Sequence, residues 1–279
     1  MKKKLPTIIL ICVFFIGLGL MLYPVVSNLV NRAHQTYAID SYNRQIAKMS
    51  KKDFQSILKD ARSYNLTITA NEFPRNQSDL DGNSDYQAAI NPSGNGMIGY
   101  LKIDSIKLRM PIYHTTKESV LQVGVGHIPT TSLPVGGKST HAVLTGHRGL
   151  PSAKLFTDLD KVKIGDVFYI YILNDILAYK VDQIKTVLPE NTSDLEIVQG
   201  KDYVSLVTCT PYGINTHRLV VRGERVPYES TVEIDGQPKD SDRVYFLKQI
   251  MMASFILLFF ILTATITFII ILRKGRRTA

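Results

Sequence analysis

The hydrophobic pattern divides the chain into two long apolar runs, one near each end, and a mixed region between them. Leu5 to Val30 contain no charged residue, and Ile250 to Leu272 form a second uncharged run of 23 residues. At about 1.5 Å per helical residue, the second run covers roughly 34 Å, which exceeds a hydrocarbon core about 30 Å thick. The pattern therefore predicts two transmembrane helices, one within residues 1–30 and one within residues 250–279.

Basic residues flank both runs on their outer sides. Three lysines at positions 2–4 precede the first run, and Arg273, Lys274, Arg276 and Arg277 follow the second. Because Lys and Arg prefer the cytoplasmic side, we expect both termini in the cytoplasm and the intervening region outside the cell membrane. A cleaved signal peptide is the alternative for the first run, but the run is too long for a signal core and has no convincing cleavage site.

The basic residues of the two tails account for most of the net charge of +9 at pH 7. Seven of the 33 Lys and Arg residues lie in the two tails, which leaves 26 basic against 24 acidic residues between them, a balance of +2. This distribution argues against nucleic-acid binding, because no basic patch remains. No metal-ligand spacing and no nucleotide-binding glycine loop occur, so we expect no cofactor and no bound metal.

The sequence of residues 31–96 predicts a separate segment of helices and loop before the main domain. From Asn31 to about Tyr64 the sequence is polar with helical spacing, and a capping-box pattern at Ser50 to Asp53 precedes an apolar stripe formed by Phe54, Ile57, Leu58 and Ala61. We expect one or two helices here. Residues 65–96 are rich in Asn, Asp, Ser, Gly and Pro, which indicates a mobile loop.

Residues 97–228 change to short apolar segments separated by turns. We predict two short helices, at 115–120 and 153–159, and a mainly β domain that forms a closed or nearly closed barrel of seven to eight strands. A polar tether over residues 229–249 follows. The predicted strands are Ile98–Ile103, Lys107–Tyr113, His141–Thr145, Val167–Leu173, Ile176–Ile184, Tyr203–Thr208 and Arg218–Arg225.

Cys209 ends one predicted strand and Arg218 begins the next, with a turn rich in Pro, Gly and Asn between them. An antiparallel return would bring the two side chains together. A thiolate nucleophile beside a guanidinium can stabilise the oxyanion of acyl transfer. A buried structural cysteine beside a surface arginine is the alternative. Cys12 lies within the first span, so Cys209 has no disulfide partner, which favours a reactive role outside the cell.

A cysteine nucleophile needs a proton-transfer partner, and six histidines are available. His147 is the best candidate, because it follows the strand that ends at Thr145 and lies between Gly146 and Gly149. His34 lies in the membrane-proximal helix, and strand alternation sends His217 to the face opposite Arg218. Ordinary hydrogen-bonded roles are expected for the remaining three, His114, His127 and His141.

Three runs of sequence resemble the sortase family, in particular the pilus-assembling class C sortases. They are Thr145 to Ala153 (TGHRGLPSA), Ser205 to Gly213 (SLVTCTPYG) and Thr216 to Leu219 (THRL), and the resemblance extends from about Gly99 to Tyr228. It implies a sortase β-barrel in which Cys209 is the nucleophile, His147 the general acid and base, and Arg218 the oxyanion or substrate-positioning residue. The family's Thr-Leu-x-Thr-Cys signature is matched except that Ser205 replaces the leading threonine.

The resemblance also implies a reaction and its partners. Such enzymes cleave a Leu-Pro-x-Thr-Gly-like sorting signal through a thioester, and the pilus-assembling ones join pilin subunits to an acceptor lysine by isopeptide bonds. Three alternatives stay open: a housekeeping sortase that anchors surface proteins to peptidoglycan, a membrane-tethered cysteine protease, and a scaffold that only binds pilins.

One feature departs from the pilus-sortase pattern. Many members carry a lid with an Asp-Pro-aromatic motif over the cleft, and this motif is absent from residues 65–96, where Glu72-Phe73-Pro74 is only a scrambled version. The resemblance therefore assigns no lid residue in this segment.

Overall fold

The computed structural model describes residues 5–68 and 84–228 of the 279-residue chain. The predicted tether, the predicted second span and the middle of the predicted mobile loop lie outside the described residues. Pro24 to Tyr228 belong to one compact unit, and the part of the first helix before Pro24 lies outside it. All contacts described below lie within the compact unit.

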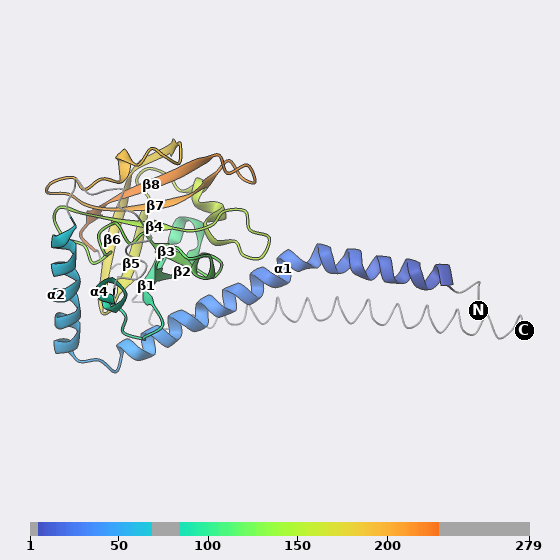
Figure 1. The fold of residues 1–279 in the computed structure, drawn as a ribbon, viewed down its shortest axis with the longest axis horizontal. Coiled ribbons are helices and arrows are strands. Elements are labelled where there is room, and N and C mark those ends of the chain that lie inside the picture. The colour runs from blue at the N-terminus through green and yellow to red at the C-terminus, as the bar shows by residue number, and fades with distance from the viewer. Residues whose placement is uncertain (1–4, 69–83, 229–279) are drawn as a thin grey trace, which may run out of the picture. The chain divides into compact units, whose positions relative to one another are not determined.

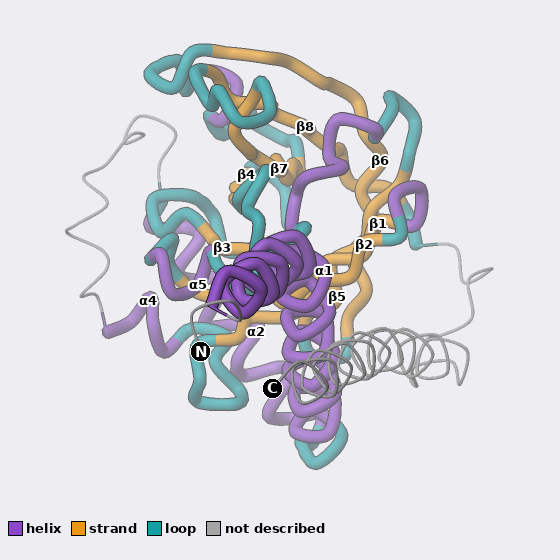
Figure 2. Tube along the Cα trace, turned by 90° about the vertical axis from the view of Figure 1, so that its right-hand side faces the viewer, coloured by secondary structure: helices purple, strands orange, loops and turns teal. Residues whose placement is uncertain are grey.

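Eight strands form a closed barrel, which confirms the predicted mainly β barrel (Figures 1 and 2). Its order is β1-β2-β3-β4-β7-β8-β6-β5, and β5 closes the ring by pairing with β1. Two pairs of neighbouring strands, β2 with β3 and β4 with β7, are parallel, and the other pairs are antiparallel. The strands are β1 (Met97–Ile103), β2 (Leu108–His114), β3 (Val125–His127), β4 (Thr140–Thr145), β5 (Val167–Ile172), β6 (Asp175–Val187), β7 (Asp202–Thr210) and β8 (His217–Val226).

Helices precede the barrel and interrupt its connections. Within residues 5–68 and 84–228, the helices are α1 (Leu5–Ile46), α2 (Lys51–Thr67), α4 (Ser84–Ala88) and α5 (Glu118–Leu121), and the 3₁₀ segments are η2 (Asp104–Ile106), η3 (Leu155–Lys161) and η4 (Ser193–Leu195). The predicted short helices at 115–120 and 153–159 correspond to α5 and η3 with shifted ends. The one or two helices predicted between Asn31 and about Tyr64 are found as the last part of α1, which continues without a break from the predicted first span, and as α2.

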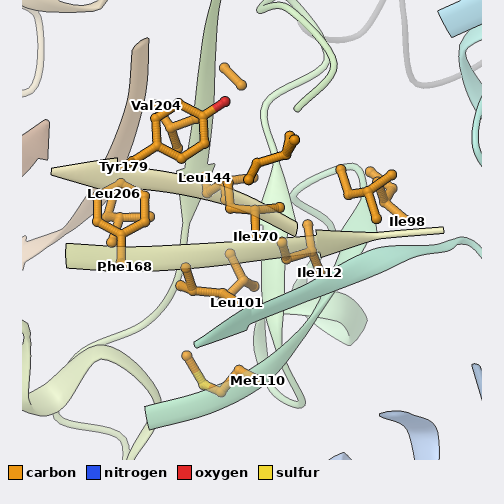
Figure 3. Close-up of a cluster of buried hydrophobic side chains, with 14 of the residues drawn as sticks. Ile98, Leu101, Met110, Ile112, Leu144, Phe168, Ile170, Tyr179, Val204 and Leu206 are labelled. Carbon is orange, nitrogen blue, oxygen red and sulfur yellow. The ribbon is translucent and has the colours of Figure 1, made fainter. Parts of the chain in front are cut away.

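The barrel interior is filled by apolar side chains from all parts of the sheet. Phe168 and Tyr179 stack with their ring centroids 5.6 Å apart, and Leu101, Leu144 and Leu206 are fully buried around them (Figure 3). Alternate residues of a strand face opposite sides, so each strand contributes one set of side chains to this core. Apolar side chains therefore occupy the barrel interior, which leaves the strand ends and loops as the places for reactive side chains.

Helix α1 docks on the barrel through its C-terminal part. Ile39 and Tyr42 are 1% exposed. The Tyr42 hydroxyl donates to the Ile98 carbonyl at 3.0 Å and accepts from the Leu173 backbone N–H at 2.7 Å. Burial raises the pKa of Tyr42, so the hydroxyl stays protonated and can keep both contacts. This one side chain joins α1 to β1 and to the turn between β5 and β6.

Helix α2 stands along one side of the barrel (Figure 1). The predicted stripe is borne out for Phe54, Leu58 and Ala61, which are buried, and Ile57 packs partly buried against them. The last buried residue, Asn65, donates from Nδ2 to the Leu133 carbonyl at 3.0 Å and accepts from the Leu133 N–H at 2.7 Å.

The part of the predicted loop that follows position 83 contains a short helix that the sequence did not predict. Ser84–Ala88 form α4, and Tyr86 and Ile90 are 0% and 1% exposed. The Tyr86 hydroxyl lies 2.9 Å from His127 Nδ1 and accepts from the Thr115 N–H at 3.1 Å. A polar composition suggested a loop, but two apolar anchors among many polar residues are enough to fix a short helix.

Among the described residues, one helix is long and apolar enough to cross a membrane by length and composition, within Ile9–Ile46. Its N-terminal part exposes large apolar side chains, for example Leu10 at 70%, Leu20 at 72% and Met21 at 77%. Continuous apolar exposure of this kind is unfavourable in water.

The start of α2 provides a test of the capping-box prediction. The Ser50 hydroxyl accepts from the Asp53 N–H at 3.2 Å, and the Asp53 carboxylate accepts from the Ser50 N–H at 2.8 Å. We expect Ser50→Ala to lower the melting temperature of the full chain by roughly 2–4 °C, because an orphan helix N–H loses its acceptor. Ser56→Ala, on the exposed face of the same helix, is the matched control and should not lower it. Equal melting temperatures for the two variants, measured by differential scanning calorimetry, would contradict this role for the cap.

Candidate active site

The β7–β8 hairpin places Cys209 directly opposite Arg218 in its antiparallel register, as the sequence predicted. Cys209 is a free, half-buried cysteine. Residues directly opposite each other on adjacent strands project to the same face of the sheet. The thiol and the guanidinium stem therefore share one face at the end of the barrel.

The turn between the two strands holds the Arg218 guanidinium. The Nη1 group donates to the carbonyls of Asn215 at 3.2 Å and His217 at 3.1 Å. Asn215 and Gly213 have positive φ values of 62° and 75°, which lets the chain reverse tightly. Two backbone acceptors therefore orient the arginine, while its remaining N–H groups can serve as donors to a bound group.

Strand β4 carries His147 to the same end of the barrel. It runs parallel to β7 with Thr145 paired to Val207, and the Gly146 N–H donates to the Val207 carbonyl at 3.2 Å. Because the two strands advance in the same direction, the position two residues after Thr145 lies alongside the position two residues after Val207. The register thus carries the chain toward the Cys209 end of β7, and His147 follows two residues after the end of β4.

Gly146 is the point where this loop passes closest to the core. A Cβ at this position would lie 2.9 Å from the Phe156 ring, a distance that real Cβ atoms do not adopt. The Thr208 hydroxyl donates to the Gly146 carbonyl at 2.7 Å, and the Phe156 N–H donates to the His147 carbonyl at 3.0 Å. A glycine at this position therefore lets the histidine loop pack on Phe156 and bond to β7.

His147 contacts a carboxylate that sequence reasoning did not single out. Its Nε2 lies 3.1 Å from Glu118 Oε2 and 3.3 Å from Oε1, and Gln122 Nε2 donates to Oε1 at 3.1 Å. The hydrogen bonds from Gln122 and then from His147 lower the pKa of Glu118. The only sequence signal was the position of Glu118 within the predicted helix at 115–120, 29 residues before the histidine.

Arg148, the residue after the histidine, is bonded to Thr210, the residue after the cysteine. Its Nη1 donates to Thr210 Oγ1 at 3.0 Å, and its Nη2 donates to Asp160 Oδ2 at 2.5 Å. The Arg148 side chain is only 8% exposed. This side chain therefore bonds the histidine loop directly to the end of β7, a link that spacing alone could not indicate.

Further along, the histidine loop is bonded to α1. The Lys154 N–H donates to Asn28 Oδ1 at 3.0 Å, and Asn31 Nδ2 donates to the Ser152 carbonyl at 2.9 Å. Residues 147–154 are therefore fixed at their start by β7 and Thr210, and near their end by α1.

The three histidines expected to have hydrogen-bonded structural roles have them. His114 contacts the Gly96 and Ala89 carbonyls, His127 contacts Ser132 and Tyr86, and His141 contacts the Glu196 carbonyl and Ser205 Oγ. Burial lowers the pKa of all three, to about 3 for His127 and about 4 for His141. Burial thus disfavours the charged form of these imidazoles, and each contacts a backbone carbonyl. Within residues 5–68 and 84–228, no group of three His, Cys, Asp or Glu side chains is arranged to hold a metal ion.

A closed barrel with a free thiol, a guanidinium and an imidazole at one end has the groups that thiol-based acyl transfer requires. Residues 101–226 match the family described as Sortase domain. The chain is 45% identical to sortase C1 from Streptococcus agalactiae, with a TM-score of 0.65 over 69% of this chain and 100% of that one. The chain belongs to the sortase family, whose members are cysteine transpeptidases.

Other relatives carry the names sortase C, Sortase A and Sortase D. Sortase C from Streptococcus pneumoniae is 41% identical, with a TM-score of 0.63 over 70% of this chain and 100% of that one. Sortase A from Bacillus anthracis is 32% identical over 130 residues, which cover 47% of this chain and 60% of that protein. The identity to the two sortase C structures is higher, whereas Sortase A from Streptococcus agalactiae, at 25% identity, matches a larger share of this chain, 78%, and 83% of that protein.

The bond between Thr208 and Gly146 can be tested directly. Thr208 is 2% exposed, so Thr208→Val would leave a buried carbonyl without its donor and cost about 1–3 kcal/mol. We expect a lower melting temperature and slower reaction with a sorting-signal peptide, because the histidine loop loses its bond to β7. Thr208→Ser keeps the hydroxyl and should retain most of both properties. A valine variant as stable and active as the serine variant would contradict this role.

The buried histidine His127 should make stability depend on pH. Its pKa is about 3 in the folded protein and about 6.5 in an unfolded chain, so the unfolded chain binds more protons between these values. The stability associated with neutral His127 is complete above pH 6.5 and is lost as the pH falls toward 3. His127→Gln cannot be protonated, so we expect its melting temperature to fall less steeply than that of the wild type between pH 7 and 4.5. Parallel melting curves over this range would rule the effect out.

Proposed function

We propose that this chain is a membrane-anchored, pilus-assembling sortase that cleaves a Leu-Pro-x-Thr-Gly-like signal and joins pilin subunits through lysine isopeptide bonds. The observation that carries the proposal is the register that gathers Cys209, Arg218 and His147 at one end of the barrel. The likeness to sortase C of Streptococcus pneumoniae, a structure described in terms of pilin substrate specificity, supports pilins as the substrates.

In the first step the Cys209 thiolate attacks the threonine carbonyl of the signal. Arg218 donates to the oxyanion that develops, and the Asn215 and His217 carbonyls keep its guanidinium oriented during this step. His147 gives a proton to the departing glycine amine, the C–N bond breaks, and a thioester remains on Cys209.

In the second step a lysine of the next pilin attacks the thioester. His147, now neutral, accepts a proton from the attacking nitrogen, the new C–N bond forms, and Cys209 leaves as a thiolate. One amide is exchanged for another through the stored acyl group, so the reaction needs no ATP. The residues 147–154 loop, bonded at both ends, keeps the imidazole in one position through both proton transfers.

We also propose a two-span topology. Residues 1–30 would form the cytoplasmic tail and first span, residues 31–96 a helical collar and loop, residues 97–228 the extracellular catalytic barrel, residues 229–249 a tether, and residues 250–279 the second span and basic cytoplasmic tail. The exposed apolar surface of α1 supports the first span. The second rests on its uncharged sequence and the basic residues that follow it.

A housekeeping sortase is the second candidate. Its support is the name Sortase A carried by relatives such as the Bacillus anthracis protein. That function would use the same three residues but would deliver the acyl group to a peptidoglycan amine and not to a pilin lysine.

The proposal predicts a ladder of pilin polymers. Cells that express the full chain with a pilin carrying the sorting signal should give high-molecular-weight ladders on a denaturing gel, and Cys209→Ala should abolish them because the thioester cannot form. Cys12→Ala removes the other free cysteine and should leave the ladders intact.

Three outcomes would contradict the proposal. Ladders from the Cys209→Ala variant would show that the cysteine is not the nucleophile. Monomeric pilin attached to the cell wall would favour the housekeeping function. Free pilin cleaved at the signal, with water as the acceptor, would favour a protease.

A further inference from the structure

Glu118 presents an open carboxylate at the proposed active site. Its side chain is 63% exposed and that of His147 is 28% exposed, with 3.1 Å between Oε2 and Nε2. Gln122 fixes the other oxygen, Oε1. A carboxylate offers about four lone-pair positions, so these contacts leave acceptor capacity for another donor.

Two carboxylates lie near the histidine loop, and they pair with different basic side chains. The positive charge of Arg148 is balanced by Asp160, with 2.5 Å between Nη2 and Oδ2. Within the part of the chain that the structure describes, Glu118 is the carboxylate that forms an ion pair with one of the three proposed catalytic residues. A cation that reached His147 would therefore meet the charge of Glu118.

We infer that Glu118 binds the ε-ammonium of the acceptor lysine beside His147 and so selects a charged primary amine over water. The inference rests on the proposed function, since it requires a thioester on Cys209 that waits for an amine. A lysine nitrogen bonded to Glu118 would lie next to the imidazole that must take its proton, since the carboxylate already touches that imidazole.

The first proton transfer of the reaction makes the Glu118 carboxylate available to an ammonium group. Before the first step, a protonated His147 and Glu118 attract each other as an ion pair. When His147 gives its proton to the departing glycine amine, that attraction falls and an ammonium can take the place of the imidazolium. One positive charge beside Glu118 is thus exchanged for another.

In the chemical step the acyl group passes from the Cys209 sulfur to the lysine nitrogen. The bound ammonium releases one proton to solvent, and the resulting amine attacks the thioester carbonyl. The C–N bond forms, the C–S bond breaks, the second proton passes from nitrogen to His147, and Cys209 leaves as a thiolate. Because Glu118 favours the charged amine, its contribution should appear in the KM for the amine and not in kcat.

The test uses the purified full chain in detergent, a Leu-Pro-x-Thr-Gly-type peptide, and two amine probes. Nα-acetyl-lysine amide carries a positive charge at neutral pH, and hydroxylamine is uncharged. We expect E118Q to raise the KM for the lysine probe about twofold to fivefold, the range of an exposed ion pair, with kcat unchanged. The KM for hydroxylamine should stay the same, and E118D should recover part of the affinity for the lysine probe.

Glu224 supplies a matched control. It pairs with Lys201 at 2.6 Å, is 39% exposed, and lies opposite Tyr203 at the other end of β7 from Cys209. E224Q removes the same charge by the same substitution and should leave the KM for both amines unchanged.

Distinct results would overturn the inference and the proposed function. An unchanged KM for the lysine probe in E118Q, or an equal rise for hydroxylamine, overturns the inference. Slower thioester formation with an unaltered ratio of amide product to hydrolysis also overturns it, and would mean that Glu118 only positions His147. A wild-type chain that forms no thioester, or that transfers the acyl group only to water, overturns the proposed function itself.

Discussion

The parallel pairing of β4 with β7 is the interaction on which the rest of the site depends. Parallel neighbours cannot be joined by a tight turn, so their ends are supplied by segments far apart in the chain. Here the crossover passes through β5 and β6 before the chain returns as β7. The pairing therefore brings an imidazole and a thiol to one edge without any local sequence relation between them.

The core beneath this edge keeps the pairing in register. Phe156 packs against Gly146, where a larger residue would not fit, and Thr208 bonds to the carbonyl of the same glycine. The buried histidines act similarly on neighbouring strands, since each contacts a backbone carbonyl and stays neutral. Polar side chains inside this barrel thus fix strand and loop positions, while the reactive groups stay at its rim.

Sequence patterns predicted the regular, strongly periodic parts of the chain. Seven of the eight strands, the capping box of α2 and the cysteine–arginine hairpin all follow from local composition. Strand β3 was missed, because three residues are too few to show alternation. Helix α4 was missed because Tyr86 lies among polar residues, and its burial depends on His127, 41 positions away. Glu118 and Arg148 were missed because each acts through a contact between distant segments, which no spacing rule encodes.

The bonds from Asn28 and Asn31 to residues 152–154 have a practical consequence. They join the proposed active-site loop to a helix that begins in the apolar N-terminal sequence, so the position of this loop depends on residues at and just after the end of the proposed membrane anchor. A soluble fragment that starts after position 31 would keep the whole barrel yet lose two of the restraints on that loop. Kinetic constants measured on such a fragment would describe a looser enzyme than the full chain.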